Sequence, residues 1–175
     1  MEKNDIESGL DCYDPERRVF GSISQRKPPT LGEFDLALIL RWKLGMFTRA
    51  HGELVRRQLA AINEAIIKAG MAGSEISAME SLSKIAGIKT AVASAILTVC
   101  YPNKFSIIDV RVLNKLNLTP MDASGWDAHK YWREYMPHVQ SFATKHELSL
   151  RDADRTLWGQ SVYEDLMTRI NTCKK

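Results

Sequence analysis

The most informative stretch of the chain is Leu82-Ser-Lys-Ile-Ala-Gly-Ile-Lys-Thr-Ala-Val-Ala-Ser-Ala-Ile-Leu97. Its pattern predicts two helices joined by a turn of about four residues around Gly87, where the missing Cβ permits a tight corner. The second helix begins directly after the turn, so its first backbone amides have no carbonyl partner within the helix. Such a helix N-terminus favours an anion, and Lys89 places a cation beside it. We therefore expect the corner to bind DNA phosphate through Gly87, Ile88, Lys89, Thr90 and Ala91.

The chain continues through Tyr101-Pro-Asn-Lys-Phe-Ser-Ile-Ile-Asp-Val-Arg111. Proline and asparagine predict a turn, and the four residues 105–108 predict a short extended apolar segment. Asp109 then opens a helix that we expect to run to about residue 116. An aspartate at this position accepts hydrogen bonds from the first amides of the helix, and the helix N-terminus favours its ionised form. Asp109 is therefore either a helix cap alone or an anion with a chemical role, and the two roles are compatible.

Together these elements resemble the helix-hairpin-helix DNA glycosylase superfamily, which includes endonuclease III and the 8-oxoguanine and alkyl-adenine glycosylases. The family pattern is a hairpin glycine, a loop containing glycine or proline, and an essential aspartate. Here these parts are Gly87, the loop 101–103 and Asp109, which follows the glycine by 22 residues. The resemblance covers residues 80–118. It implies an all-α, two-lobed helical fold with a central helix-hairpin-helix motif at residues 82–100.

The resemblance also implies an activity, which is hydrolysis of the N-glycosidic bond of a damaged or modified base in double-stranded DNA, as in base-excision repair. Asp109 would be the catalytic carboxylate, because breaking this bond builds positive charge on the sugar. Ala91 stands where bifunctional members carry a Schiff-base lysine, so the chain is expected to be monofunctional. Lys89 replaces the second hairpin glycine of the family, which weakens the expectation of tight phosphate binding.

Other site residues follow from the same resemblance. An extruded base needs a pocket with stacking surfaces, for which Trp42 and Trp132 are candidates, with core packing as the alternative for each. The helix 31–44 is similar to the family helix that ends near the wedge filling the vacated space, which places Lys43 close to DNA. Arg111 is a further DNA-binding candidate, with a solvated helix face as the alternative. No cofactor is required, although the backbone carbonyls of Ser83, Ile85 and Ile88 correspond to those that hold a monovalent cation in the family.

Helical periodicity dominates the rest of the chain, which predicts an N-terminal arm, partly irregular, over residues 1–29 and a single helical domain over residues 30–175. A capping box of Thr30 and Glu33 predicts a helix that ends at Gly45. Further helices are expected over residues 51–69, from Ser74 to residue 85, and over residues 127–147 with a kink at Pro137. Residues 119–125 are expected to form a loop, and a last helix after Ser149 is expected to break near Gly159.

Composition indicates the cellular environment and the kinds of partner that the protein is expected to have. The chain has 175 residues and a net charge of +3, with an isoelectric point of 8.8, which permits nucleic acid binding without demanding it. Its three cysteines are odd in number and far apart, which predicts free thiols, a reducing cytoplasm and no iron–sulfur cluster. The polar start predicts no signal peptide, and no apolar run predicts a membrane span. We expect a cytoplasmic, nucleoid-associated monomer.

Two other hypotheses remain open beside a glycosylase. The chain could be a catalytically inactive helix-hairpin-helix module that binds DNA or protein, which the loss of the lysine and of the second glycine favours. It could also be an unrelated helical protein in which the hairpin is coincidental. Retention of Asp109 at the family spacing favours the enzyme.

Overall fold

The all-α class predicted from the sequence is confirmed in a computed structural model, which describes residue 12, residues 14–118 and residues 125–172. No strand occurs among these residues. In chain order the elements, with η marking a π-helix, are η1 (Glu16–Phe20), α2 (Gly21–Ser24), α3 (Glu33–Leu44), α4 (Arg49–Ala69), α5 (Glu75–Ser83), α6 (Thr90–Cys100), α7 (Val110–Lys115), α8 (Ala128–Lys130), η3 (Tyr131–Tyr135), α9 (Met136–Lys145) and α10 (Leu150–Thr172).

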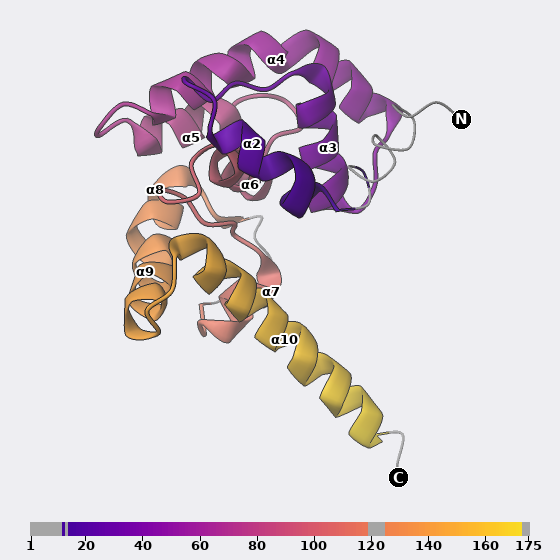
Figure 1. Cartoon of the computed structure of the whole chain (residues 1–175), viewed down its shortest axis with the longest axis vertical. Helices are drawn as coiled ribbons and strands as arrows, with labels where there is room; N and C mark the ends of the chain where they lie inside the picture. Colours follow the sequence, from indigo (N-terminus) through magenta and orange to yellow (C-terminus); the bar gives the residue numbers. More distant parts are fainter. Residues whose placement is uncertain (1–11, 13, 119–124, 173–175) are drawn as a thin grey trace.

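The helices gather in two groups along the long axis of the molecule (Figure 1). Helices α2 to α6 lie at one end, and α7 to α10 lie at the other, with α10 extending away from the body toward the C-terminus. The central element is α6, which packs against α2, α3, α4 and α5. Every residue of α6 except Ala91 is buried. The very apolar helix expected after Gly87 is therefore the core of the fold.

Part of the predicted N-terminal arm contributes to the same core. Val19, Phe20 and Ile23 are buried, and the ring of Phe20 meets that of Trp42 edge-on with 5.1 Å between centroids. Helix α2 packs directly on α6. This stretch is therefore integral to the domain.

The start of α3 differs from the predicted capping box. Gly32 is the N-cap, and the carboxylate of Asp35 accepts from its amide at 2.8 Å. Arg26 donates to both the Thr30 carbonyl and the Asp35 carboxylate at 2.6 Å, so this pairing moves the helix start past Thr30. The predicted end is confirmed, because Gly45 adopts a left-handed φ of +73°.

The helix predicted over residues 127–147 is observed as α8, the π-helix η3 and α9, which follow one another without a break, with Pro137 as the second residue of α9. Because proline has no N–H to donate, the backbone before it widens to a π-helical turn, a feature that commonly accompanies a kink. The break predicted near Gly159 is wrong, since α10 passes through it uninterrupted. The predicted loop at 119–125 lies outside the described residues except for Gly125.

No helix among residues 12, 14–118 and 125–172 is both long and apolar enough to span a membrane.

The hairpin corner is a sterically restricted position. Gly87 has a φ of +90°, and a Cβ added there would lie 2.9 Å from Cδ1 of Leu54 in α4. The amide of Ile88 donates to the Ile85 carbonyl at 2.9 Å, which closes the turn. The backbone angle therefore favours glycine here, and an added Cβ would also displace the end of the Leu54 side chain.

We expect Gly87→Ala to lower the free energy of unfolding by about 1–3 kcal/mol, because alanine is strained at this φ and Leu54 must move. Urea denaturation measures the change. Gly159→Ala is the matched control, since a Cβ at this position in α10 meets nothing within 4 Å. It should raise the free energy of unfolding by about 1 kcal/mol. Equal stability of Gly87→Ala and the unmodified protein would contradict the steric argument.

Candidate functional site

The site is built on the extended segment 105–108, which is buried in a helical core and has no strand beside it in the part of the chain that the structure describes. Buried backbone groups need hydrogen-bond partners, and two tyrosines of η3 supply them. The amide of Ser106 donates to the Tyr131 hydroxyl at 3.0 Å, and that hydroxyl donates to the Ser106 carbonyl at 2.6 Å. Tyr135 donates to the Ile107 carbonyl at 2.6 Å. Burial raises the pKa of both tyrosines, so their hydroxyls remain protonated donors.

The amides of Ile107 and Ile108 are held from two other helices, while that of Phe105 donates to the Tyr101 carbonyl at 3.2 Å. The amide of Ile108 donates to Oγ of Ser94 in α6 at 3.1 Å. The amide of Ile107 hydrogen-bonds to the carboxylate of Asp154 in α10. Three elements therefore fix the course of the backbone immediately before Asp109.

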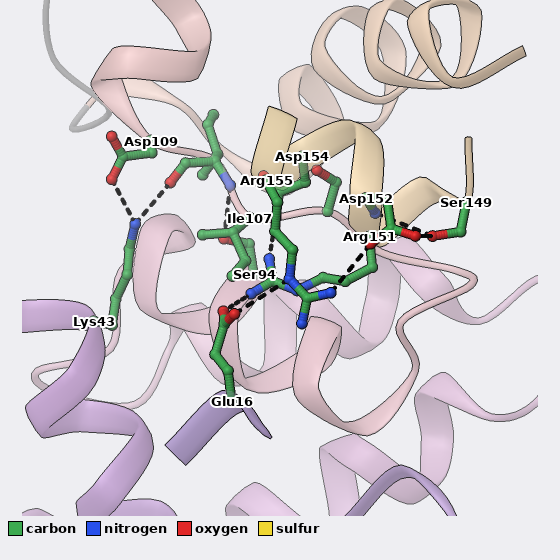
Figure 2. Close-up of polar contacts among 12 residues, drawn as sticks. Glu16, Lys43, Ser94, Ile107, Asp109, Ser149, Arg151, Asp152, Asp154 and Arg155 are labelled. Carbon is green, nitrogen blue, oxygen red and sulfur yellow. Dashed lines mark hydrogen bonds and ion pairs between the residues drawn. The ribbon is translucent and has the colours of Figure 1, made fainter. Parts of the chain in front are cut away.

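Asp109 caps α7, as predicted. Its Oδ1 accepts from the amide of Arg111 at 3.0 Å. Its Oδ2 accepts from Nζ of Lys43, in the last turn of α3, at 2.9 Å. Lys43 also donates to the Ile108 carbonyl at 3.3 Å, and Figure 2 shows both of its contacts. Lys43, which the resemblance places close to DNA, therefore contacts the candidate catalytic carboxylate of Asp109.

The charge state of Asp109 follows from these contacts. Burial by itself raises the pKa of this carboxyl, but the Lys43 ammonium and the Arg111 amide together bring the pKa below its ordinary value of 3.8. The group is therefore an anion at neutral pH. Its side chain is 27% exposed and that of Lys43 is 10% exposed, so the pair is confined but still reachable from solvent.

Asp109 and Lys43 open into a cleft of about 570 Å³, within the range of small-molecule sites. The cleft forms where η1, α3, α7 and α10 meet. Its lining combines aromatic rings with charges of both signs and consists of Glu16, Trp42, Lys43, Ile107, Asp109, Val110, Arg111, Arg151, Asp154, Arg155 and Trp158.

The face of α10 that lines the cleft was missed by the sequence reasoning. Arg151, Asp154, Arg155 and Trp158 follow a spacing of three, four and seven residues, which places them on one side of a helix. All four lie on the helix predicted between Ser149 and Gly159, but nothing in the sequence indicated that this face meets Asp109. The signal available in the sequence was the mixture of arginine, aspartate and tryptophan at helical spacing.

Arg151 connects the parts of this wall. Its guanidinium pairs with Asp154 and with Glu16 of η1, as Figure 2 shows. It also lies over the ring of Trp42, with Cζ 5.6 Å from the centroid. Arg155 makes a second ion pair to Glu16 at 3.2 Å. The network joins the N-terminal end of the core, α3 and α10 behind the cleft.

Asp154 is the second aspartate of the cleft, and its carboxyl behaves differently from that of Asp109. It is 3% exposed. Burial raises its pKa to about 6, against the opposing effects of Arg151 and of the Ile107 amide. Near neutral pH, of the two aspartates in the cleft, Asp109 is therefore firmly ionised and Asp154 is close to its titration point.

The other predicted site residues are placed as follows. Trp42 lines the cleft and is partly buried. Arg111 lines the cleft and pairs with Asp165 at 3.7 Å. Trp132 is not among the lining residues; its ring packs against Phe105 with centroids 5.8 Å apart, which matches the core-packing alternative.

The hairpin presents a bare helix N-terminus. Gly87 and Lys89 are exposed and Ala91 is partly buried. Lys89, the N-cap of α6, makes no side-chain cap hydrogen bond. Among the described residues no acceptor meets the amides of Lys89, Thr90 and Ala91, whereas the amide of Val92 donates to the Lys89 carbonyl at 2.9 Å. Ile88 and Thr90 are buried, and the Thr90 hydroxyl donates to the Trp126 carbonyl. Phosphate could therefore reach the backbone and the lysine at this corner.

Helix α6 links this corner to Asp109. Ser94, which holds the Ile108 amide, follows Thr90 by four residues, or about 6 Å along the helix axis. The N-terminus of α6 and the backbone that precedes Asp109 are therefore held at nearby points of the same helix.

Within residues 12, 14–118 and 125–172, no group of three or more histidine, cysteine, aspartate or glutamate residues is arranged to hold a metal ion. The cation expected at the carbonyls of Ser83, Ile85 and Ile88 stays a prediction. Of these carbonyls, that of Ile85 already accepts the Ile88 amide.

The raised pKa of Asp154 predicts how the free energy of unfolding changes with pH. Between about pH 4 and about pH 6 the folded chain holds a proton that the unfolded chain has released, so the raised pKa lowers stability as pH rises through this window. The variant Asp154→Asn has no titrating carboxyl at this position and therefore lacks this loss of stability. Its free energy of unfolding relative to the unmodified protein should increase by about 2–3 kcal/mol from about pH 4 to about pH 7.5, as measured by urea denaturation.

Asp152→Asn is the matched control on the same helix. Its side chain accepts from Ser149 and Arg155, which lower the pKa of this exposed carboxyl. The difference between this variant and the unmodified protein should therefore not grow in the same direction. Parallel pH curves for Asp154→Asn and the unmodified protein would show that Asp154 titrates normally.

No family model, curated protein or solved structure matches the chain. The resemblance to helix-hairpin-helix glycosylases therefore stays a prediction from the sequence motif.

Proposed function

We propose that the chain binds double-stranded DNA and hydrolyses the N-glycosidic bond of a damaged or modified base. The observation that carries the proposal is the placement of an ionised, solvent-accessible Asp109 in an aromatic-lined cleft. The anion would stabilise positive charge that develops on the sugar, or activate water beside it. In this proposal the two groups of helices correspond to the two lobes of a glycosylase, with the cleft between them.

The walls of the cleft fit an extruded base. Trp42 and Trp158 offer flat apolar surfaces on which a base could stack. Arg111 and Arg155 add positive charge suited to the flanking phosphates. DNA would supply the ligand for the bare N-terminus of α6, and no organic cofactor is needed for hydrolysis.

A turn next to the cleft fits the role of a wedge. Directly after Lys43, the large apolar side chains of Leu44, Met46 and Phe47 are exposed by 40%, 59% and 42%. Exposed apolar groups of this size are costly unless they have a partner. Insertion between base pairs would cover them and fill the space left by the extruded base.

One observation favours the alternative of a catalytically inactive DNA-binding module. The carboxylate of Asp109 is already engaged by Lys43 at 2.9 Å, and an ion pair that simply fastens α3 to α7 needs no reaction. The site for DNA at the hairpin would be the same in both cases. Cytoplasmic, nucleoid-associated placement and a monomeric state accompany either proposal.

We expect Asp109→Asn to reduce single-turnover base excision by at least about 100-fold on the duplex that the unmodified protein processes best. Asparagine caps a helix as well as aspartate does, so this change removes the charge and preserves the cap. The assay uses duplexes that each carry one modified base, with release of the base followed by chromatography.

Asp127→Asn is the matched control, because Asp127 also caps a helix, accepting from the Lys130 amide at 2.7 Å, and is not among the residues lining the cleft. It should retain full excision. If the unmodified protein releases no base from a broad panel, the enzymatic proposal fails for those lesions and the binding module is favoured. Equal rates for Asp109→Asn and Asp127→Asn would show that Asp109 is not the catalytic group.

Phosphate binding at the hairpin predicts a salt effect. DNA affinity should fall as salt rises, and Lys89→Ala should weaken binding and reduce the slope of log K against log salt by about one. Fluorescence anisotropy with a labelled duplex measures both quantities. Lys145→Ala, an exposed position at the end of α9, should leave the slope unchanged. An unchanged slope for Lys89→Ala would place the DNA elsewhere.

A further inference from the structure

We infer that the protein forms a two-fold symmetric dimer in which an exposed apolar stripe on α10 packs antiparallel against the same stripe of a second copy. The stripe consists of Tyr163, Leu166, Met167 and Ile170. The inference goes beyond the proposed function and does not depend on it. It departs from the monomer expected from the sequence.

The distal part of α10 has little to pack against in its own chain. The buried residues of this helix, Ala153, Asp154 and Leu157, all lie in its first half, and no residue from 158 to 172 is buried. Figure 1 shows this part extending away from the body. It is about 22 Å long. Because a helix gains most of its stability from packing one apolar face, a partner for this part is expected.

The stripe provides such a face. Tyr163, Leu166, Met167 and Ile170 are exposed by 65%, 53%, 38% and 50%. They lie three, four and seven residues after the first of them, so they share one side of the helix. A contiguous group of large exposed apolar side chains marks an interaction surface.

The stripe lies away from the contacts that α10 makes with its own chain. Helix α10 packs against α7, where Glu164 pairs with Lys115 at 2.7 Å. Asp165 pairs with Arg111 of the same helix at 3.7 Å. At about 100° per residue, the stripe lies largely on the side opposite to this acidic pair. A second copy could therefore cover it without displacing α7.

The spacing of the stripe favours another α10 as the partner. Tyr163, Leu166 and Ile170 alternate by three and four residues, which is the spacing at which two helices pack in a coiled coil. The helix that covers them must present the same spacing, and a second copy of the chain does so by symmetry. Such a contact is isologous, so it closes at two copies.

Charges beside the stripe favour the antiparallel direction. Glu164 and Asp165 lie near its start, and Arg169, whose side chain is 74% exposed, lies near its end. In an antiparallel pair the acidic end of one stripe lies beside the basic end of the other, whereas a parallel pair would place like charges at the same level. Opposed helix dipoles favour the same direction.

The area of the contact indicates its strength. The four side chains and the polar residues beside them would bury on the order of 500 Å² in each copy, so the interface reaches roughly the 1,000 Å² of a weak but specific association. The dimer should therefore dissociate in the micromolar range, at about 1–100 µM.

Sedimentation equilibrium of the full chain, from about 1 to about 200 µM, tests the inference. We expect a reversible equilibrium between monomer and dimer. Leu166→Glu should weaken dimerisation at least about tenfold, because its two new carboxylates meet near the symmetry axis. The position is exposed, so the helix content measured by circular dichroism should stay unchanged. Ile170→Glu, one turn further along, provides a second variant with the same expected result.

Met71→Glu is the matched control, because Met71 is 58% exposed in the turn after α4 and lies outside the stripe. It should leave the dissociation constant unchanged. A chain that stays monomeric over the whole concentration range would overturn the inference. Dimerisation that persists in both stripe variants, or that Met71→Glu weakens equally, would also overturn it, because the interface would then lie elsewhere.

Cross-linking measures the direction of the pair. Chains with Cys12→Ser and Cys173→Ser, in which Cys100 is buried, carry either Tyr163→Cys or Ile170→Cys. When the two chains are mixed and oxidised, the disulfide between unlike chains should exceed those between like chains. A preference for like chains would overturn the antiparallel arrangement.

Dimerisation and base excision are separable, because Asp154 and Trp158, which line the cleft, are not part of the stripe. Where the unmodified protein excises a base, Leu166→Glu should excise it at the same single-turnover rate. A protein that dimerises through the stripe but releases no base would support the inference and count against the glycosylase.

Discussion

The site depends on an extended, buried segment that crosses a helical core, with no strand beside it among residues 14–118 and 125–172. An unsatisfied buried amide or carbonyl costs about 1–3 kcal/mol, so the segment 105–108 can lie there only if side chains replace a sheet partner. Ser94, Tyr131, Tyr135 and Asp154 do so from three different elements. The same contacts that satisfy the backbone fix where the chain emerges at Asp109. The same hydrogen bonds therefore stabilise the core and orient the Asp109 carboxylate.

The electrostatics of the cleft follow from its depth. Asp109 lies at the opening, where Lys43 and a helix N-terminus outweigh the cost of burial and keep the carboxyl ionised. Asp154 lies behind it, where burial dominates although Arg151 is bound to it. Two aspartates of ordinary chemistry thus acquire opposite proton affinities from their surroundings, an arrangement that is common at catalytic sites and also occurs in structural ion-pair networks. The proposed enzyme uses the first as its anion, and the second holds the backbone that carries it.

Local features of the sequence predicted local structure well. Gly87 and Gly45 adopt the left-handed angles that their positions suggested, and Asp109 caps the helix that follows it. Thr30 and Gly159 were misjudged, because Arg26 and Asp35 formed a better cap than the predicted box, and because a glycine inside a long packed helix costs too little to end it.

Long-range pairing could not be predicted in the same way. Lys43 and Asp109 are 66 residues apart, and Glu16 and Arg151 are 135 residues apart; no pattern in a single sequence links them. Trp132 was as plausible a stacking residue as Trp42 until the packing of η3 placed its ring against Phe105. The cleft is created by the docking of α10 on the remainder of the fold. Its composition was therefore visible in the sequence, but its assembly was not.

The central claim is that the Asp109 carboxylate faces the sugar of a DNA strand bound in the cleft. Binding of two duplexes tests it most directly, one with a cationic pyrrolidine in place of an abasic sugar and one with the neutral tetrahydrofuran analogue. The cationic duplex should bind at least about tenfold more tightly, because an ion pair forms with the buried anion, and Asp109→Asn should abolish this preference. Equal affinity of the unmodified protein for both duplexes would contradict the placement of the carboxylate beside the sugar.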